Sequence, residues 1–293
     1  MTPKEQNNLE SALSKKSLPF TDQAGRDIQI LKHEQAAELA FEYKTNIHEI
    51  YSFALEKGIM PYRYVRNLQS ISIEEQLKLC RSRVSVIGAG GLGGQVVLML
   101  ARTGIGELTV IDHDVFDETN LNRQALSSLE ALGHYKAEIA KETVESINPG
   151  VKVTSVKERL NNSNAGKILS GFHVIVDALD NISDRFVLEE TARNLNVPLV
   201  HGAVAGFEGQ LMTIFPGDAG MENLYGRSRE YESDNKSPVA ILGVPAVSPA
   251  IIATHQVIEV LKIILKRDGL FRNMMIYMDL ERCEARKLRF GKE

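Results

Sequence analysis

From residue 83 onward, apolar runs alternate with amphipathic segments in a regular order. Short and continuously apolar runs predict buried strands at 83–87, 107–111, 151–156 and 173–178, and near 198–201. Segments with apolar residues at helical spacing separate most of these runs, at 92–103, 134–147 and 183–195. Apolar strands that are spaced by helices indicate a parallel sheet covered on both faces. The pattern therefore predicts an α/β fold with a doubly wound, Rossmann-like sheet.

The pattern changes after His201. The segment GAVAGFEGQLMTIFPG at 202–217 combines glycine with β-forming residues, and it predicts a C-terminal antiparallel extension of the sheet. Residues 217–243 form a long polar stretch, and a loop of this length in a compact domain tends to be functional or disordered. An apolar helix near 246–265 and a strand near 274–278 complete the predicted domain.

The first 60 residues have a different pattern. Residues 1–20 are polar and predict a mobile tail, whereas 33–58 carry apolar residues at helical spacing. We therefore expect residues 1–60 to contain a polar tail and a small helical appendage. Residues 61–293 are expected to form the α/β domain.

Charge and composition exclude several classes of protein. The chain has 34 basic and 38 acidic residues and a net charge of −4, whereas proteins that hold a nucleic-acid backbone usually carry a basic excess. No apolar stretch approaches the ~20 residues of a membrane helix. The first 16 residues, MTPKEQNNLESALSKK, lack an apolar signal core, so we expect a cytoplasmic protein with no membrane partner. The two cysteines, Cys80 and Cys283, form no C-x-x-C pair.

Residues 84–94, VSVIGAGGLGG, contain a glycine fingerprint for nucleotide binding. An apolar strand leads into Gly88, Gly90 and Gly93 at G-x-G-x-x-G spacing, and Asp112 ends the next predicted strand. The glycines let the backbone approach a phosphate, and an acidic residue at this place accepts the ribose hydroxyls. These features suit NAD, FAD and ATP equally well.

The segment IDHDVFDETNLNRQ at 111–124 is more informative. It supplies Arg123, and Lys136 lies in the first turn of the next predicted helix. The strand at 173–178 leads into Asp180. Because parallel strands end at one edge of the sheet, we expect these side chains to face one cleft. Two cations and one carboxylate suit a triphosphate with Mg²⁺ rather than a hydride-accepting ring.

With these motifs in place, the chain resembles the ThiF/MoeB/HesA family, whose members adenylate the C-terminal carboxylate of small ubiquitin-like sulfur-carrier proteins. The resemblance runs from about Pro61 to Phe290. Its motifs are RYVRN at 63–67, GAGGLGG at 88–94, D-x-D and N-x-x-R-Q within 112–124, Lys136, DALDN at 177–181 and GAVAGFEGQ at 202–210.

The resemblance implies a role for each matching residue. Arg123, Lys136 and Asp180 would act in catalysis, with Asp180 also the magnesium ligand, and Asp112 would hold the ribose. Arg66 would reach the phosphates in a neighbouring subunit's site, because such enzymes are typically homodimers. The implied nucleotide-binding positions are Gly88, Gly90, Gly91, Gly93, Asp112, Asp114, Asn120, Gln124 and Asn181. The implied cofactors are ATP and Mg²⁺.

The sequence departs from the family pattern in its cysteines. Many members bind a structural zinc through two C-x-x-C pairs, and some carry a cysteine in the loop that corresponds to 217–243. This chain has neither. We therefore expect no zinc and no thioester formed through that loop. The resemblance implies instead that a carrier protein with a Gly-Gly tail is adenylated and then receives sulfur from an external donor.

Several interpretations compete. The preferred one is adenylylation of the carrier, with 202–209 and 217–243 forming a channel for its tail. An NAD-dependent oxidoreductase would use the same glycines but leaves Arg123, Lys136 and Asp180 unexplained. A related branch of the superfamily activates a carboxylate on transfer RNA and also lacks the zinc, although the acidic balance and the GFEGQ segment argue against it. A non-catalytic binding subunit is disfavoured because every expected phosphate and magnesium position is filled.

Overall fold

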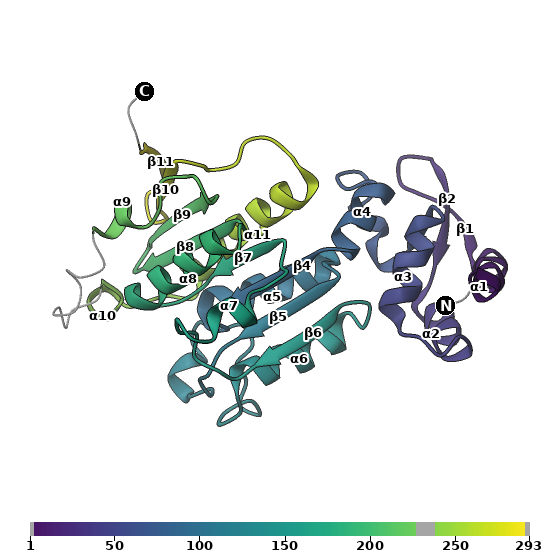
Figure 1. Ribbon diagram of the computed structural model, residues 1–293, viewed down its shortest axis with the longest axis horizontal. Helices are drawn as coiled ribbons and strands as arrows, with labels where there is room; N and C mark the ends of the chain where they lie inside the picture. Colours follow the sequence, from purple (N-terminus) through teal and green to yellow (C-terminus); the bar gives the residue numbers. More distant parts are fainter. Residues whose placement is uncertain (1–2, 227–237, 291–293) are drawn as a thin grey trace.

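A computed structural model describes residues 3–226 and 238–290 (Figure 1). Its large sheet consists of β4 (Arg83–Ile87), β5 (Glu107–Ile111), β6 (Lys152–Val156), β7 (Val174–Asp177), β8 (Leu199–Ala205), β9 (Glu208–Ile214), β10 (Met274–Asp279) and β11 (Glu284–Arg289). The strand order is β11-β10-β9-β8-β7-β4-β5-β6. The neighbouring strands β6, β5, β4, β7 and β8 are parallel, whereas β9, β10 and β11 continue the sheet from β8 as antiparallel neighbours. This arrangement confirms the predicted doubly wound sheet with an antiparallel extension.

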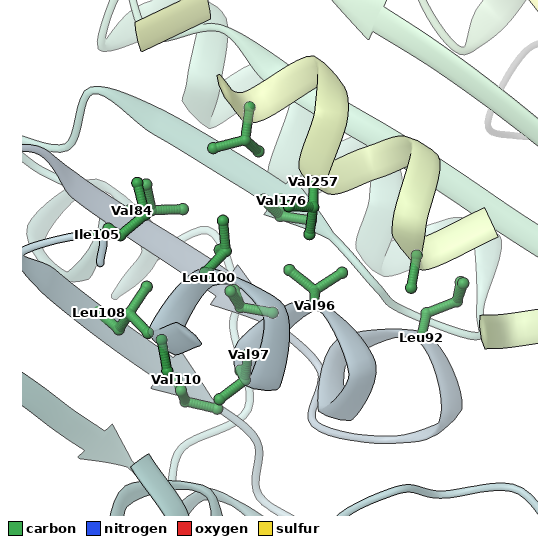
Figure 2. Close-up of a cluster of buried hydrophobic side chains, with 14 of the residues drawn as sticks. Val84, Leu92, Val96, Val97, Leu100, Ile105, Leu108, Val110, Val176 and Val257 are labelled. Atoms are coloured by element: carbon green, nitrogen blue, oxygen red, sulfur yellow. The ribbon is translucent and has the colours of Figure 1, made fainter. Parts of the chain in front are cut away.

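Helices cover both faces of this sheet, as the continuously apolar strands predict. They are α4 (Ile73–Cys80), α5 (Gly91–Thr103), α6 (Lys136–Ile147), α7 (Ala165–Ile168), α8 (Ile182–Asn194) and α11 (Val247–Leu265). Helices α5, α6 and α11 contribute to one core, and α7 and α8 contribute to the core on the other face. Figure 2 shows the first core, where Val84 and Val176 of the strands meet Leu100 of α5 and Val257 of α11.

Within the described residues, α11 is the one helix that is long and apolar enough to cross a membrane by length and composition alone. In this fold one side of the helix is buried in the core, and Ile251 and Ile258 on the other side are exposed. Ile252, Ala253 and Val260 are fully buried, and the helix packs on α5 and β8.

The long polar stretch contains two short helices, α9 (Glu222–Tyr225) and α10 (Pro238–Leu242). The part of the stretch at 227–237 lies outside the described residues. After α10 the chain returns to the sheet, where the Gly206 N–H donates a hydrogen bond to the Gly243 carbonyl (2.8 Å).

The N-terminal unit has more structure than its sequence pattern predicts. It consists of α1 (Pro3–Lys16), β1 (Leu18–Thr21), β2 (Asp27–Leu31), α2 (His33–Glu42), α3 (Ile47–Glu56) and β3 (Ile59–Pro61), and the strands form a separate sheet in the order β1-β2-β3. The prediction of a mobile tail was wrong, because α1 buries Leu9 and Leu13 completely in a core of this unit. The helices α2 and α3 correspond to the predicted appendage.

Asn148 joins this unit to the large domain. The 3₁₀ helix η1 (Tyr62–Asn67) follows β3, and Asn148 follows α6. The Asn148 side chain donates to the Tyr64 hydroxyl (2.7 Å) and the Ala101 carbonyl (2.8 Å), and it accepts from Arg63 (2.6 Å) and the Gly150 N–H (3.1 Å). The unit therefore lies at the edge where the parallel strands begin, opposite to their carboxyl ends (Figure 1).

We expect Asn148→Ala to lower the free energy of unfolding by about 2–4 kcal/mol, because it leaves several buried polar groups without partners. Urea unfolding followed by circular dichroism measures this. The control is Asn162→Ala, an exposed loop residue whose change should stay within about 0.5 kcal/mol. Equal stabilities of the two variants would show that the junction contributes nothing.

Candidate active site

The cleft begins where the carboxyl ends of β4 and β7 meet, at the point where the order of the parallel strands reverses. Gly88 follows β4 with a φ of +93°, and a Cβ there would lie 2.5 Å from the Ala178 carbonyl oxygen. A Cβ on Gly93 would overlap the Gly88 carbonyl oxygen. These two glycines therefore allow the β4 turn, the β7 turn and helix α5 to pack closely.

The N-terminus of α5 faces the cleft. Gly90 is its N-cap residue, and no side chain caps the first turn. The free N–H groups of that turn are suited to an anionic phosphate. The neighbouring Gln124 is buried, and its Oε1 has no hydrogen-bond partner among the described residues. A ligand hydroxyl would supply the missing donor, so this end of the cleft fits a nucleotide.

The structure brings most of the predicted site residues together in this cleft. Those that line it are Gly88, Gly90, Gly91, Asp112, Asp114, Arg123, Gln124, Lys136, Asp180 and Asn181. The expected convergence of two cations and one carboxylate is therefore present in the structure.

Both cations are held in place by neighbouring groups. Lys136 begins α6 and is 7% exposed, and its Nζ lies 3.1 Å from Asp114 Oδ2. Arg123 donates from Nη1 to the Thr119 carbonyl (2.9 Å) and to Asn122 Oδ1 (2.8 Å). These contacts orient positive charge toward the cleft in the absence of a ligand.

Asp112 is held by two backbone groups. Its Oδ2 accepts from the Ala89 N–H (2.7 Å) and its Oδ1 from the Asp114 N–H (2.8 Å). Burial raises the pKa of Asp112 above its ordinary value, although both hydrogen bonds favour the ionised form. Each carboxylate oxygen keeps a lone pair for a ligand hydroxyl, which fits the implied contact with a ribose.

Asp180 differs from Asp112 because its carboxylate is exposed in the cleft. Within 3–226 and 238–290, no residue forms a hydrogen bond or ion pair with it. Mg²⁺ binds through one or two carboxylates together with substrate phosphates. A carboxylate without such a partner among the described residues, in the same cleft as the α5 N-terminus, therefore fits a magnesium ion held with a triphosphate.

Three predicted residues have other positions or tasks. Gly93 does not line the cleft and serves the packing of α5. Asn120 is also absent from the cleft, because its Oδ1 accepts from the Asp117 N–H (3.1 Å) and closes the turn before Arg123. Asn181 lines the cleft, but its side chain caps α8 by accepting from the Asp184 N–H (2.9 Å).

Arg66 does not reach the cleft of its own chain. It is exposed on η1, at the edge of the sheet where strands begin. The cleft lies at the opposite edge. A single chain therefore does not assemble the complete predicted set, and the contribution of Arg66 to a neighbouring subunit stays a prediction.

The sequence analysis missed Arg159, which lines the cleft and forms a bidentate ion pair with Asp184 (3.1 Å for each nitrogen). It also missed Arg185, which lies at the floor of the cleft. A signal for Arg159 was present, because it follows the strand predicted at 151–156 and strand ends converge on this edge. Arg185 lies within a predicted helix and gave no such signal.

The ThiF family description matches residues 64–293, a range that includes every residue lining the cleft. The chain belongs to the ThiF family. This assignment agrees with the resemblance inferred from the motifs.

Two curated relatives of this ThiF-family chain are named as an activating enzyme and as a probable adenylyltransferase. SAMP-activating enzyme E1 of Haloferax volcanii is 36% identical over 219 residues, which cover 74% of this chain and 80% of that protein. The probable molybdopterin-synthase adenylyltransferase of Porphyra purpurea is 34% identical, over 69% of this chain and 54% of that protein. The chain thus spans most of the first relative and about half of the second.

Solved structures share the fold. E. coli MccB determined with ATP has a TM-score of 0.67 and 22% identity, covering 88% of this chain and 83% of that chain. PaaA has a TM-score of 0.67 and 19% identity, covering 94% of this chain and all of that chain. With 94% of the ThiF-family chain covered, the likeness extends into the N-terminal unit.

We expect Asp112→Asn to weaken Mg²⁺-ATP binding about 10- to 100-fold at pH 7.5, because hydrogen bonds to a charged group contribute about 1.5–3 kcal/mol. Burial raises the pKa of Asp112, so its carboxylate is protonated at a higher pH than that of an exposed aspartate. On acidification, the wild type should therefore begin to lose affinity for Mg²⁺-ATP at this higher pH. Calorimetric titration from pH 7.5 to 4.5 measures both effects.

Asp112→Asn also controls for the protonation of ATP itself, which is common to both proteins. The two affinities should therefore converge as the pH falls. Exposed Asp268→Asn should behave like the wild type. Parallel pH curves for Asp112→Asn and the wild type would contradict the role of Asp112.

Proposed function

We propose that this protein transfers the adenylyl group of ATP to the C-terminal glycine carboxylate of a small ubiquitin-like sulfur-carrier protein. The observation that carries the proposal is the meeting of Arg123, Lys136 and Asp180 in one cleft beside the uncapped α5 N-terminus. The names of the Haloferax and Porphyra relatives support the same chemistry and substrate class. The cytoplasmic location and the absence of zinc stay predictions.

In the reaction, a carboxylate oxygen bonds to the α-phosphorus and the bond from that phosphorus to the bridging oxygen of the β-phosphate breaks. Pyrophosphate leaves with the electron pair. The nucleophile is ionised at neutral pH, so no general base is needed. Arg123, Lys136 and the α5 N–H groups counter the repulsion between the carboxylate and the phosphates. Mg²⁺, held by Asp180, would neutralise phosphate oxygens when bound.

One wall of the cleft suits a narrow, uncharged tail. It consists of Val204 of β8, Val239 of α10, Val244 of the segment before α11, and Pro249 of the first turn of α11. Two hydrogen bonds hold the chain after α10 against Gly206, the residue that follows β8. Ser248 Oγ donates to the Gly206 carbonyl (2.7 Å), and the Gly206 N–H donates to the Gly243 carbonyl. This apolar wall supports a tail of glycines, whose lack of side chains lets the carboxylate approach the α-phosphate.

The cysteines support an external sulfur donor. Neither Cys80 nor Cys283 lines the cleft. Burial raises the pKa of Cys80 to about 12, so its thiol is protonated at neutral pH. Cys283 lies on the exposed turn between β10 and β11. We therefore propose that the acyl-adenylate is released from this chain to a separate sulfur source.

A homodimer would complete the site. Arg66 is exposed at the far edge of its own domain, so it can serve only the cleft of a second copy. Its guanidinium would add a further positive charge near the phosphates.

An NAD-dependent oxidoreductase is the competing function. The same glycines and Asp112 would serve it, but Arg123, Lys136 and Asp180 would then have no task. A carboxylate on transfer RNA is disfavoured by the net charge of −4. Thermal unfolding with Mg²⁺-ATP and with NAD⁺ at matched concentrations separates adenylylation from hydride transfer, since a ligand of the native state raises its stability.

We expect Asp180→Ala and Arg123→Ala each to reduce carrier-dependent exchange of labelled pyrophosphate into ATP by at least about 100-fold, because each removes charge stabilisation at the α-phosphate. The carrier is a small ubiquitin-like protein ending in Gly-Gly. Asp268→Ala and Arg282→Ala, both exposed and outside the cleft, are matched controls. Full exchange in both cleft variants would refute the site, and no exchange by the wild type would refute the carrier.

Mixing two inactive variants tests the role of Arg66. Arg66→Ala and Asp180→Ala should each be inactive, because every site of a homodimer then lacks one group. Random exchange of subunits at equal amounts makes half of the dimers mixed, and each mixed dimer has one intact site. We expect about a quarter of wild-type pyrophosphate exchange to return. Recovery near zero would show that Arg66 and Asp180 do not act across two subunits.

A further inference from the structure

A buried polar network lies directly below the turn that carries Asp180. Asp177 ends β7 and His201 lies in β8, and both side chains are 0% exposed. Arg185 of α8 is 6% exposed. The fourth member is Tyr225, the last residue of α9, which belongs to the long polar stretch at 217–243. We call these four residues the Tyr225 network.

The hydrogen atoms of this network have one consistent arrangement. Tyr225 Oη receives hydrogen bonds from Arg185 Nη1 (2.9 Å) and from Gln210 Nε2. Its own hydrogen therefore points to His201 Nε2 at 3.1 Å. The His201 Nδ1–H then donates to Asp177 Oδ2 at 2.6 Å. Burial lowers the pKa of His201, in agreement with this neutral tautomer.

The network holds both backbone groups of Leu179, the residue before Asp180. The Leu179 N–H donates to Asp177 Oδ1 (2.9 Å), and the Leu179 carbonyl accepts from Arg185 Nη2 (2.5 Å). On the other side, Asn181 is fixed as the cap of α8. No described residue forms a hydrogen bond or ion pair with the Asp180 carboxylate, although the charge of Arg159 acts on it across the cleft. The backbone of Leu179 and Asn181 is therefore the main constraint that the described residues place on its position.

We propose that the Tyr225 network positions Asp180 for the metal–nucleotide complex, with Tyr225 and His201 as positioning residues. The proposal rests on the proposed function for the task of Asp180. Tyr225 and His201 do not line the cleft, so their effect would reach the ligand through the Leu179–Asp180 backbone or through Arg185, which does line it. An effect through Asp180 changes the contribution of Mg²⁺, whereas an effect through Arg185 changes the affinity for ATP without Mg²⁺ as well.

Stability alone does not account for this arrangement. Burying charged groups costs free energy unless their hydrogen bonds are satisfied. Packed apolar residues of similar volume in their place often leave the stability of the fold unchanged or raise it. Here the buried Arg185 Nε has no hydrogen-bond partner in the part of the chain that the structure describes, and it lies 3.5 Å from Asp177 Oδ2. A network with an incompletely satisfied cation is better explained by the position it imposes on Leu179.

A double-mutant cycle tests the proposal by binding alone. The quantity measured is the gain in ATP affinity that Mg²⁺ provides. It is the dissociation constant of ATP measured in EDTA, divided by the dissociation constant of ATP measured in Mg²⁺. Tyr225→Phe keeps the ring and should reduce this gain about tenfold, with the affinity in EDTA changed less than about twofold. Asp180→Asn should abolish the gain. The double variant should lose no more than Asp180→Asn, because Tyr225 acts through Asp180.

Tyr43→Phe removes a hydroxyl from a half-buried tyrosine of the N-terminal unit and should leave the gain unchanged. If Tyr225→Phe does not fold, His201→Asn takes its place, because it retains a donor near Nδ1 and removes the acceptor at Nε2. A wild-type gain in the folded variant, or an additional loss in the double variant, would overturn the proposal.

The experiment uses no carrier protein. A failure to find carrier-dependent exchange would therefore leave the result intact. An unchanged gain in Asp180→Asn would overturn the positioning proposal together with the assignment of Asp180 as the metal ligand.

Discussion

The site depends on how closely two strand ends and one helix approach each other. Gly88 has a backbone conformation that favours glycine and lies where a Cβ would meet the Ala178 carbonyl. Gly93 of α5 lies where a Cβ would overlap the Gly88 carbonyl oxygen, so it lets α5 pack against the turn after β4. The uncapped helix N-terminus and the Asp180 turn therefore face one small volume. A larger residue at Gly88 would push the turn after β7, which carries Asp180, away from the N-terminus of α5. It would thus disturb the site without removing any side chain that contacts the ligand.

The charged groups of the cleft are fixed by different means. Lys136 and Arg123 are oriented through their own side chains, one by a carboxylate and the other by a carbonyl and an amide. No residue within 3–226 or 238–290 forms a hydrogen bond or ion pair with the Asp180 carboxylate, so among these residues its position is set mainly by the backbone that carries it. This difference matches their tasks, because preorganised cations stabilise a developing charge without reorganising, whereas a metal ligand must leave its oxygens open to the ion.

The apolar pattern predicted the centre of the large sheet well because β4, β7 and β8 are largely buried and cannot be confused with surface segments. It missed β11, whose residues are all exposed and carry no apolar run. The site followed because parallel strands end at one edge, which brought Arg123, Lys136 and Asp180 together from three segments. The pattern failed for α1, where Leu9 and Leu13 are two apolar residues in a polar stretch and become buried only against other elements. Asn120 and the network below Asp180 depend on local backbone geometry, which residue types alone do not reveal.

Helix α6 has its two ends in different parts of the molecule. Lys136 begins it in the cleft, and Asn148 at its other end is locked to the N-terminal unit by Arg63 and Tyr64. Its 12 residues span about 18 Å at 1.5 Å per residue. The helix therefore links the N-terminal unit to the cleft through one rigid element. If α6 tilted by about 3° about its Asn148 end, the Lys136 end would move by about 1 Å, which is comparable to the difference between a hydrogen bond and a lost contact.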